Sequence, residues 1–387
     1  MAPDARLMEH VRALAGVIGP RPPASEAEGR AAAYVAEQLR ALGIEPVREQ
    51  AFTSAIPIGR TSLLLTTLMA LGLVAGRGGR MAKLAGGAAV ASCAYALYRL
   101  LRGSPLPLTD LFPGQDSRNL IAHILPVKRS RQFLFLTANL DSDRARVTHV
   151  EGAPLLRRAA GTGLIGLGAL AGLSMMADAL LGRHKSSGTQ TAAAFLSVVS
   201  AALLGYDEMQ PPAVGANGNA SGVAVLLGLA EALIEKPLEH TEVVLLFTGA
   251  QEASASGLNA YVRQFAPPRS DTWWIDVEMV GAGDLAYVAE GGVSLFTTYR
   301  PSPRITALAH EVAVQRPELG VTPQTLDLMG GALPLVNAGY EAIAVTGYKA
   351  QGANGAASPD STDTVSAEVM ARAQTYIGAL IRAIDEQ

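Results

Sequence analysis

Residues 242–250 have the sequence Glu-Val-Val-Leu-Leu-Phe-Thr-Gly-Ala, and this stretch decides the fold. The run from Val243 to Phe247 is continuously apolar, which is typical of a strand buried on both of its faces. Such strands lie inside parallel sheets whose two faces are both covered by helices. The stretch therefore predicts an α/β protein.

The segments around this strand alternate between strand and helix patterns. We expect further strands at 119–125, 132–140, 272–280 and 341–348, and helices at 25–42, 221–234, 302–315 and 366–385. The first of these helices opens with a capping-box pattern, Ser25 and Glu28, and ends at Gly43. Alternation of this kind predicts a mixed, mostly parallel sheet sandwiched by helices, with ligands bound beyond the carboxyl ends of its strands.

The composition excludes several classes of protein. The 387 residues are 49% hydrophobic and 17% charged, with a mean hydropathy of +0.24, so the chain is too apolar to be disordered. The net charge of −3 gives no basic excess for nucleic acid. The only cysteine, Cys93, excludes an internal disulfide framework and a Cys-rich zinc module.

Four predominantly apolar runs interrupt the α/β pattern, at 61–76, 84–97, 159–181 and 191–204. The third is long enough to span a bilayer, which takes about 20 residues, and the other three are somewhat shorter. All four contain many small residues, as closely packed membrane helices do. We expect two transmembrane helical hairpins, and the alternative is a set of buried core helices.

These hairpins divide the chain into one α/β domain and two insertions. The predicted domain comprises residues 1–58, 103–156 and 206–387, and the predicted hairpins comprise 59–102 and 157–205. Each hairpin returns the chain to the same side, so we expect a multi-pass integral membrane protein with its domain on one face. Basic residues flank both ends of the hairpins equally. The absence of a signal-peptide pattern in residues 1–12 favours a cytoplasmic domain.

Three segments stand out at expected strand ends: 138–142 (Ala-Asn-Leu-Asp-Ser), 215–222 (Gly-Ala-Asn-Gly-Asn-Ala-Ser-Gly) and 249–252 (Gly-Ala-Gln-Glu). They resemble the signature segments of the two-zinc aminopeptidase family, whose relatives include glutaminyl cyclases and the transferrin-receptor ectodomain. The resemblance covers about residues 12–50 and 117–387. Asp141 and Gly215 are 74 residues apart, more than the family spacing, so the second hairpin is an insertion.

The family's chemistry requires two zinc ions bridged by a carboxylate and held by His, Asp and Glu, with a Glu as general base. By the resemblance, the first His ligand falls on Asn139 and the bridging Asp falls on Gly218. The Asp that supports the site is retained as Asp141. An amide is a poor zinc ligand and glycine has no side chain, so both positions argue against the metal centre.

The remaining family positions also argue against a metal centre. The general base falls on Gln251, which has no carboxyl group, and the last His ligand falls on Pro359. The neighbouring Glu ligand is retained as Glu252, and an Asp ligand is replaced conservatively by Glu278. We therefore expect no bound zinc, although the family uses it, and no confident catalytic residue. Glu252 and Glu278 alone can form at most a weak site for a hard cation such as Mg²⁺ or Ca²⁺.

Two other residues are candidates to rescue the site. His149, with Asp143, follows the Asn139 strand, and we expect it to face solvent in a connecting segment. Asp360 follows Pro359, and we expect it to be a solvated loop residue.

The sequence thus predicts a membrane-anchored pseudo-peptidase that acts by partner binding or scaffolding. Its expected partners are membrane lipid and a protein, and not nucleic acid. One hypothesis is that Glu252, Glu278 and Asp141 bind the amino terminus of a peptide without cleaving it. The alternatives are an active metal-dependent aminopeptidase with a rebuilt metal site and a structural subunit of a larger membrane complex.

Overall fold

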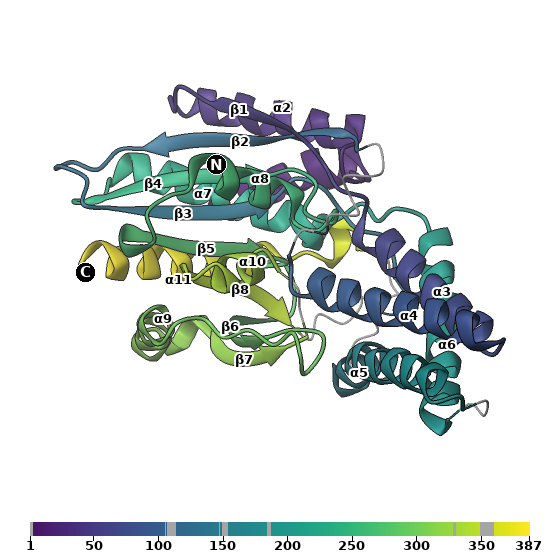
Figure 1. Ribbon diagram of the computed structural model, residues 1–387. Coiled ribbons are helices and arrows are strands. Elements are labelled where there is room, and N and C mark those ends of the chain that lie inside the picture. The colour runs from purple at the N-terminus through teal and green to yellow at the C-terminus, as the bar shows by residue number, and fades with distance from the viewer. Residues whose placement is uncertain are drawn as a thin grey trace.

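A mixed eight-stranded sheet forms the centre of the protein, with helices on both faces (Figure 1). The structure, a computed structural model, describes residues 3–104, 106, 114–146, 148, 154–183, 187–327, 330–348 and 360–387. The strand order is β1-β2-β4-β3-β5-β8-β6-β7. The strands are β1 (Arg48–Thr53), β2 (Asp116–Ile124), β3 (Gln132–Asn139), β4 (Thr241–Thr248), β5 (Thr272–Glu278), β6 (Asp284–Gly291), β7 (Thr322–Leu326) and β8 (Glu341–Tyr348).

The pairing confirms the predicted α/β class and its mostly parallel sheet. The neighbours β4-β3, β3-β5, β5-β8 and β6-β7 are parallel, whereas β1-β2, β2-β4 and β6-β8 are antiparallel. Strand β4 is buried on both faces, as its sequence predicts: Leu245 belongs to the core under one face, and Val244 and Leu246 belong to the core under the other.

More helices cover one face of the sheet than the other. The larger core lies under α1 (Pro3–Val11), η1 (Arg12–Ile18), α2 (Glu26–Ala41), α7 (Ser221–Glu235), α9 (Pro303–Gln315) and α11 (Ala367–Asp385). The smaller core lies under α8 (Ser256–Phe265) and α10 (Ala332–Asn337). Short helical turns, η4 (Ala216–Ala220), η5 (Arg269–Asp271), η6 (Pro317–Leu319) and η7 (Thr362–Thr364), complete the described elements.

The capping box predicted at the start of α2 is only half formed. The Ser25 side chain accepts the Glu28 N–H, as expected for an N-cap. The Glu28 carboxylate, however, accepts the N–H of Ala24 and turns into the protein interior. Glu28 therefore points toward the strand ends and does not close the capping box of α2.

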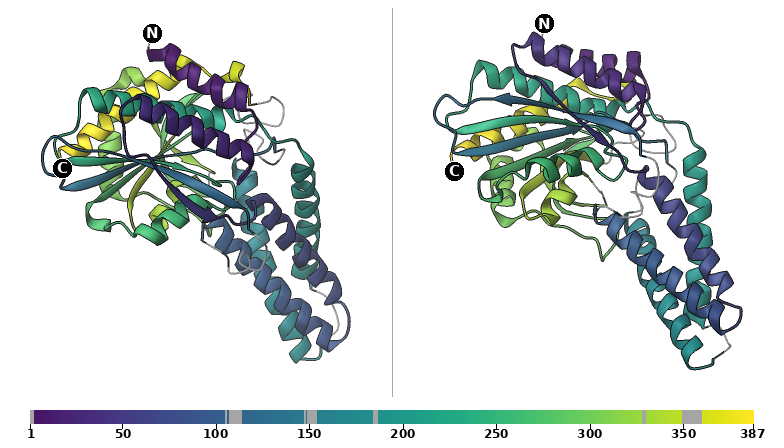
Figure 2. Two further views of the ribbon diagram at one scale, coloured as in Figure 1. Left: turned by 90° about the horizontal axis from the view of Figure 1, so that it is seen from above. Right: turned by 45° about the horizontal axis from the view of Figure 1, so that its top comes forward.

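The four apolar runs form helices that extend beyond the runs themselves. They are α3 (Ile58–Ala75), α4 (Arg80–Leu101), α5 (Pro154–Leu180) and α6 (Gly188–Met209). The helices are longer because the charged residues at their ends, such as Arg80 and Glu208, continue the helical backbone. The two hairpins pack together as one bundle that projects from the α/β domain (Figure 2).

Glycines allow the helices of the bundle to approach closely. A Cβ atom on Gly86 would lie 2.5 Å from the carbonyl oxygen of Gly72, which joins α3 to α4. A Cβ atom on Gly87 would lie 2.7 Å from the carbonyl oxygen of Gly172, which joins α4 to α5. Contacts of this kind are typical of membrane helices.

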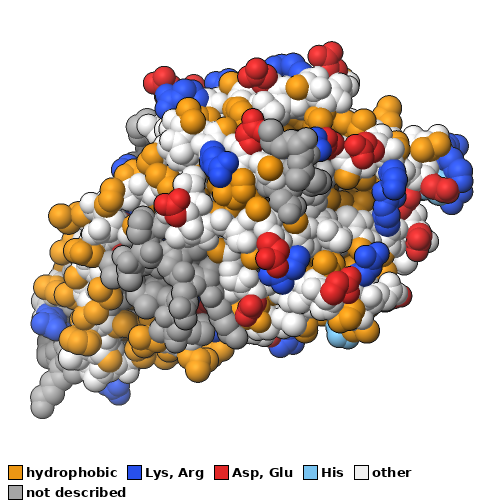
Figure 3. All heavy atoms as spheres, turned by 180° about the vertical axis from the view of Figure 1, so that it is seen from behind, with side chains coloured by type: hydrophobic (Ala, Val, Ile, Leu, Met, Phe, Trp, Pro, Cys, Tyr) orange, Lys and Arg blue, Asp and Glu red, His pale blue; other side chains and the backbone are white. Residues whose placement is uncertain are grey.

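The outside of the bundle is apolar. Its exposed side chains include Leu64, Leu68, Leu71, Val74, Leu170, Leu173, Phe195, Val198 and Leu203. Figure 3 shows the same contrast, with hydrophobic side chains over the bundle and charged side chains gathered over the α/β domain. Five helices of the described residues are long and apolar enough to cross a membrane, namely α3–α6 and the segment Ala216–Glu235. The fifth is 72% buried and belongs to the domain core.

All four connections between domain and bundle lie at one edge of the sheet. Strand β1 ends at Thr53, which pairs with Asp116 at the start of β2, and β3 ends at Asn139 beside Thr248 of β4. This is the edge where the parallel strands β3 and β4 have their carboxyl ends. The bundle therefore begins next to the place where ligands bind in sheets of this type.

Candidate functional site

The buried carboxylate of Asp141 organises the carboxyl ends of β3 and β4. Its Oδ1 accepts the N–H of Gln251 at 3.0 Å, and its Oδ2 accepts the N–H of Glu252 at 2.8 Å. The side chain is fully buried, and burial raises its pKa to about 6. Asp141 is therefore a structural acceptor for the loop after β4 and does not reach a ligand.

Asn139, which by the resemblance falls at the position of the family's first metal ligand, forms an amide pair with Asn219. Asn139 donates from Nδ2 to the Asp141 carbonyl oxygen at 3.0 Å, and its Oδ1 accepts from Asn219 Nδ2, also at 3.0 Å. Asn219 also donates to the carbonyl oxygen of Val277 and accepts the N–H groups of Gly222 and Met279. The two amides thus join the ends of β3 and β5 to the start of α7.

Asp360 lies beside Gly218, which by the resemblance falls at the position of the bridging carboxylate. Its Oδ1 accepts the N–H of Asn217 at 2.6 Å and its Oδ2 accepts the N–H of Gly218 at 2.9 Å. A Cβ atom on Gly218 would lie 3.6 Å from Oδ2 of Asp360. Burial raises the pKa of Asp360. The expectation of a solvated loop residue was therefore wrong, because two backbone N–H groups bind this carboxylate.

Arg21 binds the same loops from the other side. Its guanidinium donates to five backbone carbonyl oxygens, those of Leu14, Gly19, Leu140, Val214 and Gly215, at 2.8–2.9 Å. The side chain is only 1% exposed, and burial lowers its pKa to about 10. One cation thus connects the amino-terminal segment to the loops after β3 and before η4.

Glu28 completes the polar interior. Its Oε1 accepts the N–H of Ala250 at 2.6 Å, and its Oε2 accepts the hydroxyl of Ser117 at 2.7 Å. Burial, together with the charge of Asp141, raises its pKa to about 7.

Glu252 lies beside a cavity at the base of the bundle. The cavity has a volume of about 280 Å³ and is also lined by Arg60, Asp143, Arg146 and Glu208. Burial and the charges of Asp143 and Asp141 raise the Glu252 pKa well above its usual range. Among the three carboxylates proposed for peptide binding, only Glu252 lines this cavity.

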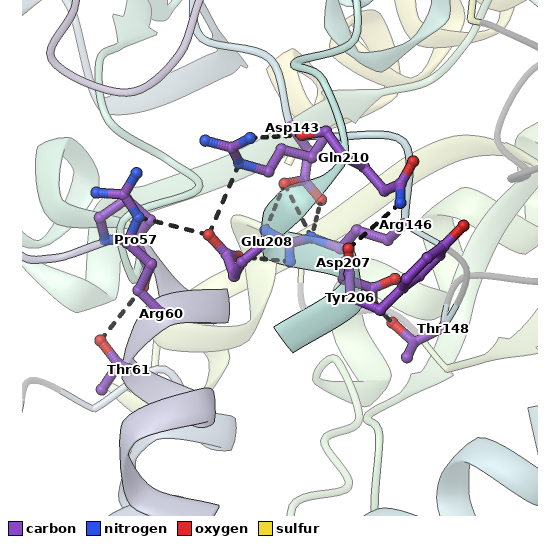
Figure 4. Close-up of polar contacts among 11 residues, drawn as sticks. Pro57, Arg60, Thr61, Asp143, Arg146, Thr148, Tyr206, Asp207, Glu208 and Gln210 are labelled. Atoms are coloured by element: carbon purple, nitrogen blue, oxygen red, sulfur yellow. Dashed lines mark hydrogen bonds and ion pairs between the residues drawn. The ribbon is translucent and has the colours of Figure 1, made fainter. Parts of the chain in front are cut away.

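Ion pairs in this cavity join the bundle to the domain (Figure 4). Arg146 donates to Asp143 at 2.7 Å and to Glu208 of α6 at 2.9 Å. Arg60 of α3 pairs with the same Glu208 at 3.5 Å. Both hairpins are therefore tied to the segment that follows Asp141.

Glu278 does not reach this cavity and lies instead under Gly330 and Gly331. Its Oε1 accepts the N–H of Gly331 at 3.0 Å, and its carboxyl group hydrogen-bonds the buried carboxylate of Asp276. Burial and the charge of Asp276 raise the pKa of Glu278 well above its usual range. Glu278 is thus held by neighbours in the protein interior and does not line the cavity beside Glu252.

These residues do not fit the two zinc ions that the fold family implies. The amide of Asn139 is hydrogen-bonded at both ends, and positions 218 and 251 carry no carboxylate or imidazole. Within the described residues, no three His, Cys, Asp or Glu side chains are grouped so as to hold a metal ion. Pro359 lies outside the described residues, as do His149 and His184.

Several of these contributors were missed in the sequence. Asn219 follows Gly218 directly, and its role depends on a contact with Asn139, 80 residues away. Arg21 stands in the Gly-Pro-Arg-Pro segment 19–22, but nothing in that motif indicates five carbonyl partners. The inward orientation of Glu28 was not predicted, because its position in the sequence matches a capping box.

The mixed sheet, with its polar groups gathered at the carboxyl ends of β3 and β4, has the fold of the zinc-exopeptidase-like α/β proteins. The structure is similar to BSAP, a zinc aminopeptidase from Bacillus subtilis, with a TM-score of 0.56 and 14% identity over 98% of this chain and 94% of that one. It is also similar to a glutaminyl cyclase from an Acidobacteriales bacterium, with a TM-score of 0.57 and 12% identity over 99% and 94% of the two chains. No curated protein matches the sequence.

The sequence gives a narrower assignment for its second half. Residues 199–381 match the family described as peptidase family M28. The matched part of the chain contains positions 218, 251, 252 and 278 of the site.

The raised pKa values predict that stability falls as the pH rises. Folding raises the pKa of Glu28 from 4.5 to about 7 and that of Asp141 from 3.8 to about 6, so the folded state binds more protons over this interval. Each group lowers the free energy of unfolding by up to about 1.4 kcal/mol per pH unit there. The thermal midpoint of the purified protein should therefore decrease from pH 5 to pH 8.

The variant Glu28→Gln should be less stable but should show a weaker pH dependence, because Glu28 no longer contributes. Glu26→Gln, two residues away on the exposed side of α2, is the matched control and should keep the full dependence. An unchanged pH slope in Glu28→Gln would contradict the assignment.

Proposed function

We propose that this protein is a non-catalytic, membrane-anchored member of the peptidase fold that acts by binding a partner. The observation that carries the proposal is the amide pair of Asn139 and Asn219, which uses hydrogen bonds where the family places a metal. Gln251, at the position of the general base, has no carboxyl group to take a proton from water.

The polar groups at the strand ends support a structural role. Asp141, Asp360 and Arg21 bind backbone N–H and carbonyl groups, so each of these side chains has a task in shaping the loops. The loops thus keep a fixed shape without a bound ion.

The bundle supports membrane anchoring. At about 1.5 Å per residue, the 18 residues of α3 and the 22 residues of α4 and of α6 have lengths of about 27 and 33 Å, close to the hydrocarbon core of a bilayer. The ionisable residues in the described parts of these helices, such as Arg60, Lys83, Asp178 and Glu208, lie near the helix ends. This placement avoids the high cost of a charge at the bilayer centre.

The cavity beside Glu252 supports partner binding. A carboxylate whose pKa is raised by burial gains from a bound cation, because an ammonium group stabilises its ionised form. The amino terminus of a peptide provides such a group, and the absence of a general base leaves it uncleaved.

Metal content tests the loss of the catalytic centre. The protein, purified in mild detergent without chelator, supplied with zinc and dialysed, should contain far less than one zinc per chain by elemental mass spectrometry. One or two equivalents that disappear in Glu252→Ala would show a rebuilt site, and the aminopeptidase alternative would then replace the proposal.

Peptide binding tests the role of Glu252. A short peptide with a free amino terminus should bind the wild type, and Glu252→Gln should weaken it about tenfold, since a hydrogen bond to a charged group contributes about 1.5 kcal/mol or more. The acetylated peptide and the variant Glu26→Gln are the controls. Equal binding of free and acetylated peptides would exclude this mode of recognition.

Extraction tests the anchoring. The full chain should remain in the membrane pellet after washing with alkaline carbonate, because four apolar helices hold it. Release into the supernatant would favour the alternative in which these helices are core elements of a soluble protein.

A further inference from the structure

The loop after β6, residues 292–299, packs along the beginning of α5. Arg158 donates from Nε to the carbonyl oxygen of Gly292 at 2.9 Å, and the Thr162 hydroxyl accepts the N–H of Leu295 at 3.0 Å. Further along α5, a Cβ atom on Gly166 would lie 3.3 Å from the ring of Phe296. The loop therefore follows one face of the helix rather than crossing it.

These contacts place the loop at the depth of the apolar run. Positions 158, 162 and 166 are spaced by four residues, so they lie on one side of the helix and extend over about 12 Å. The apolar run of α5 begins at residue 159, directly after Arg157 and Arg158. The tip of the loop therefore lies about two turns beyond the last charged residues.

The loop has its polar side chains inside and its apolar side chains outside. Ser294 and Thr297 are buried, and their hydroxyl groups are hydrogen-bonded to each other at 2.8 Å. Leu295 and Phe296 between them are 68% and 50% exposed. A loop in water shows the opposite arrangement.

Charged groups lie at the base of the loop. Glu290 pairs with Arg300 at 2.6 Å and with Arg158 at 3.3 Å. Charges at the base and apolar groups at the tip match the passage from headgroups to acyl chains at a membrane surface.

We propose that Leu295 and Phe296 insert into the bilayer beside α5 and form a further membrane contact of the α/β domain. This inference rests on the proposed membrane anchoring. Lipid is the occupant because the tip is continuous with the exposed apolar side chains of α5, among them Leu170 and Leu173. The loop then fixes the tilt of the domain against the membrane surface.

Depth-dependent fluorescence quenching tests the inference. Cys93, the only cysteine, is replaced by Ala, and single cysteines are introduced at Leu295, at Leu173 and at Val314. Leu173 lies on the bundle and is 57% exposed, and Val314 lies on α9, far from the bundle, and is 64% exposed (Figure 1). Each is labelled with an environment-sensitive fluorophore and reconstituted into phosphatidylcholine vesicles that contain a spin-labelled lipid.

We expect the label at 295 to be quenched by the lipid and shifted to the blue, as at 173, and the label at 314 to be quenched only by aqueous iodide. If 173 is quenched by lipid but 295 behaves like 314, the inference fails and the anchoring stands. If 295 is protected from both quenchers, a protein covers the loop and the lipid assignment is wrong. If 173 is not quenched by lipid, both the anchoring and the inference fail.

Discussion

Two successive N–H groups of the loop that follows β4 depend on one acceptor, the buried carboxylate of Asp141. The N–H groups of Gln251 and Glu252 point into the protein, and a buried N–H without a partner destabilises a fold. Asp141 satisfies both, while Asn139 and Asn219 connect it to the neighbouring strand and helix. Arg21, Glu28 and Asp360 extend the same principle around the strand ends. The edge of the sheet is thus held by fixed charges and amides of the chain itself.

This arrangement gives the polar residues at the strand ends structural tasks. Asp141 accepts backbone N–H groups of the loop after β4. Asn139 accepts a hydrogen bond from Asn219, and Asp360 accepts the N–H of Gly218. By the resemblance to the two-zinc aminopeptidases, positions 139 and 218 are those of metal ligands, so under the proposed loss of the metal these hydrogen bonds take its place.

The sequence predicted the middle of the fold well and its margins poorly. Strand β4 was evident because burial on both faces requires a continuous apolar run. The edge strands β1 and β7 have the sequences Arg-Glu-Gln-Ala-Phe-Thr and Thr-Pro-Gln-Thr-Leu, and they show no such pattern because they are largely exposed. In the site, the resemblance identified Asn139, Gly218 and Gln251 as departures from the family. The hydrogen-bond partners found at these positions were not predictable, since Asn219 and Asp360 reach the site only through the tertiary fold.

The two hairpins enter and leave the domain through four separate connections, all at one edge of the sheet. A domain on a single terminal helix is freed when a protease cuts one stalk. Here, cutting any one connection leaves three others, and the ion pairs of Arg146 with Asp143 and Glu208 still join the parts. Under the proposed membrane anchoring, a protein built in this way would not release its domain after a single proteolytic cut.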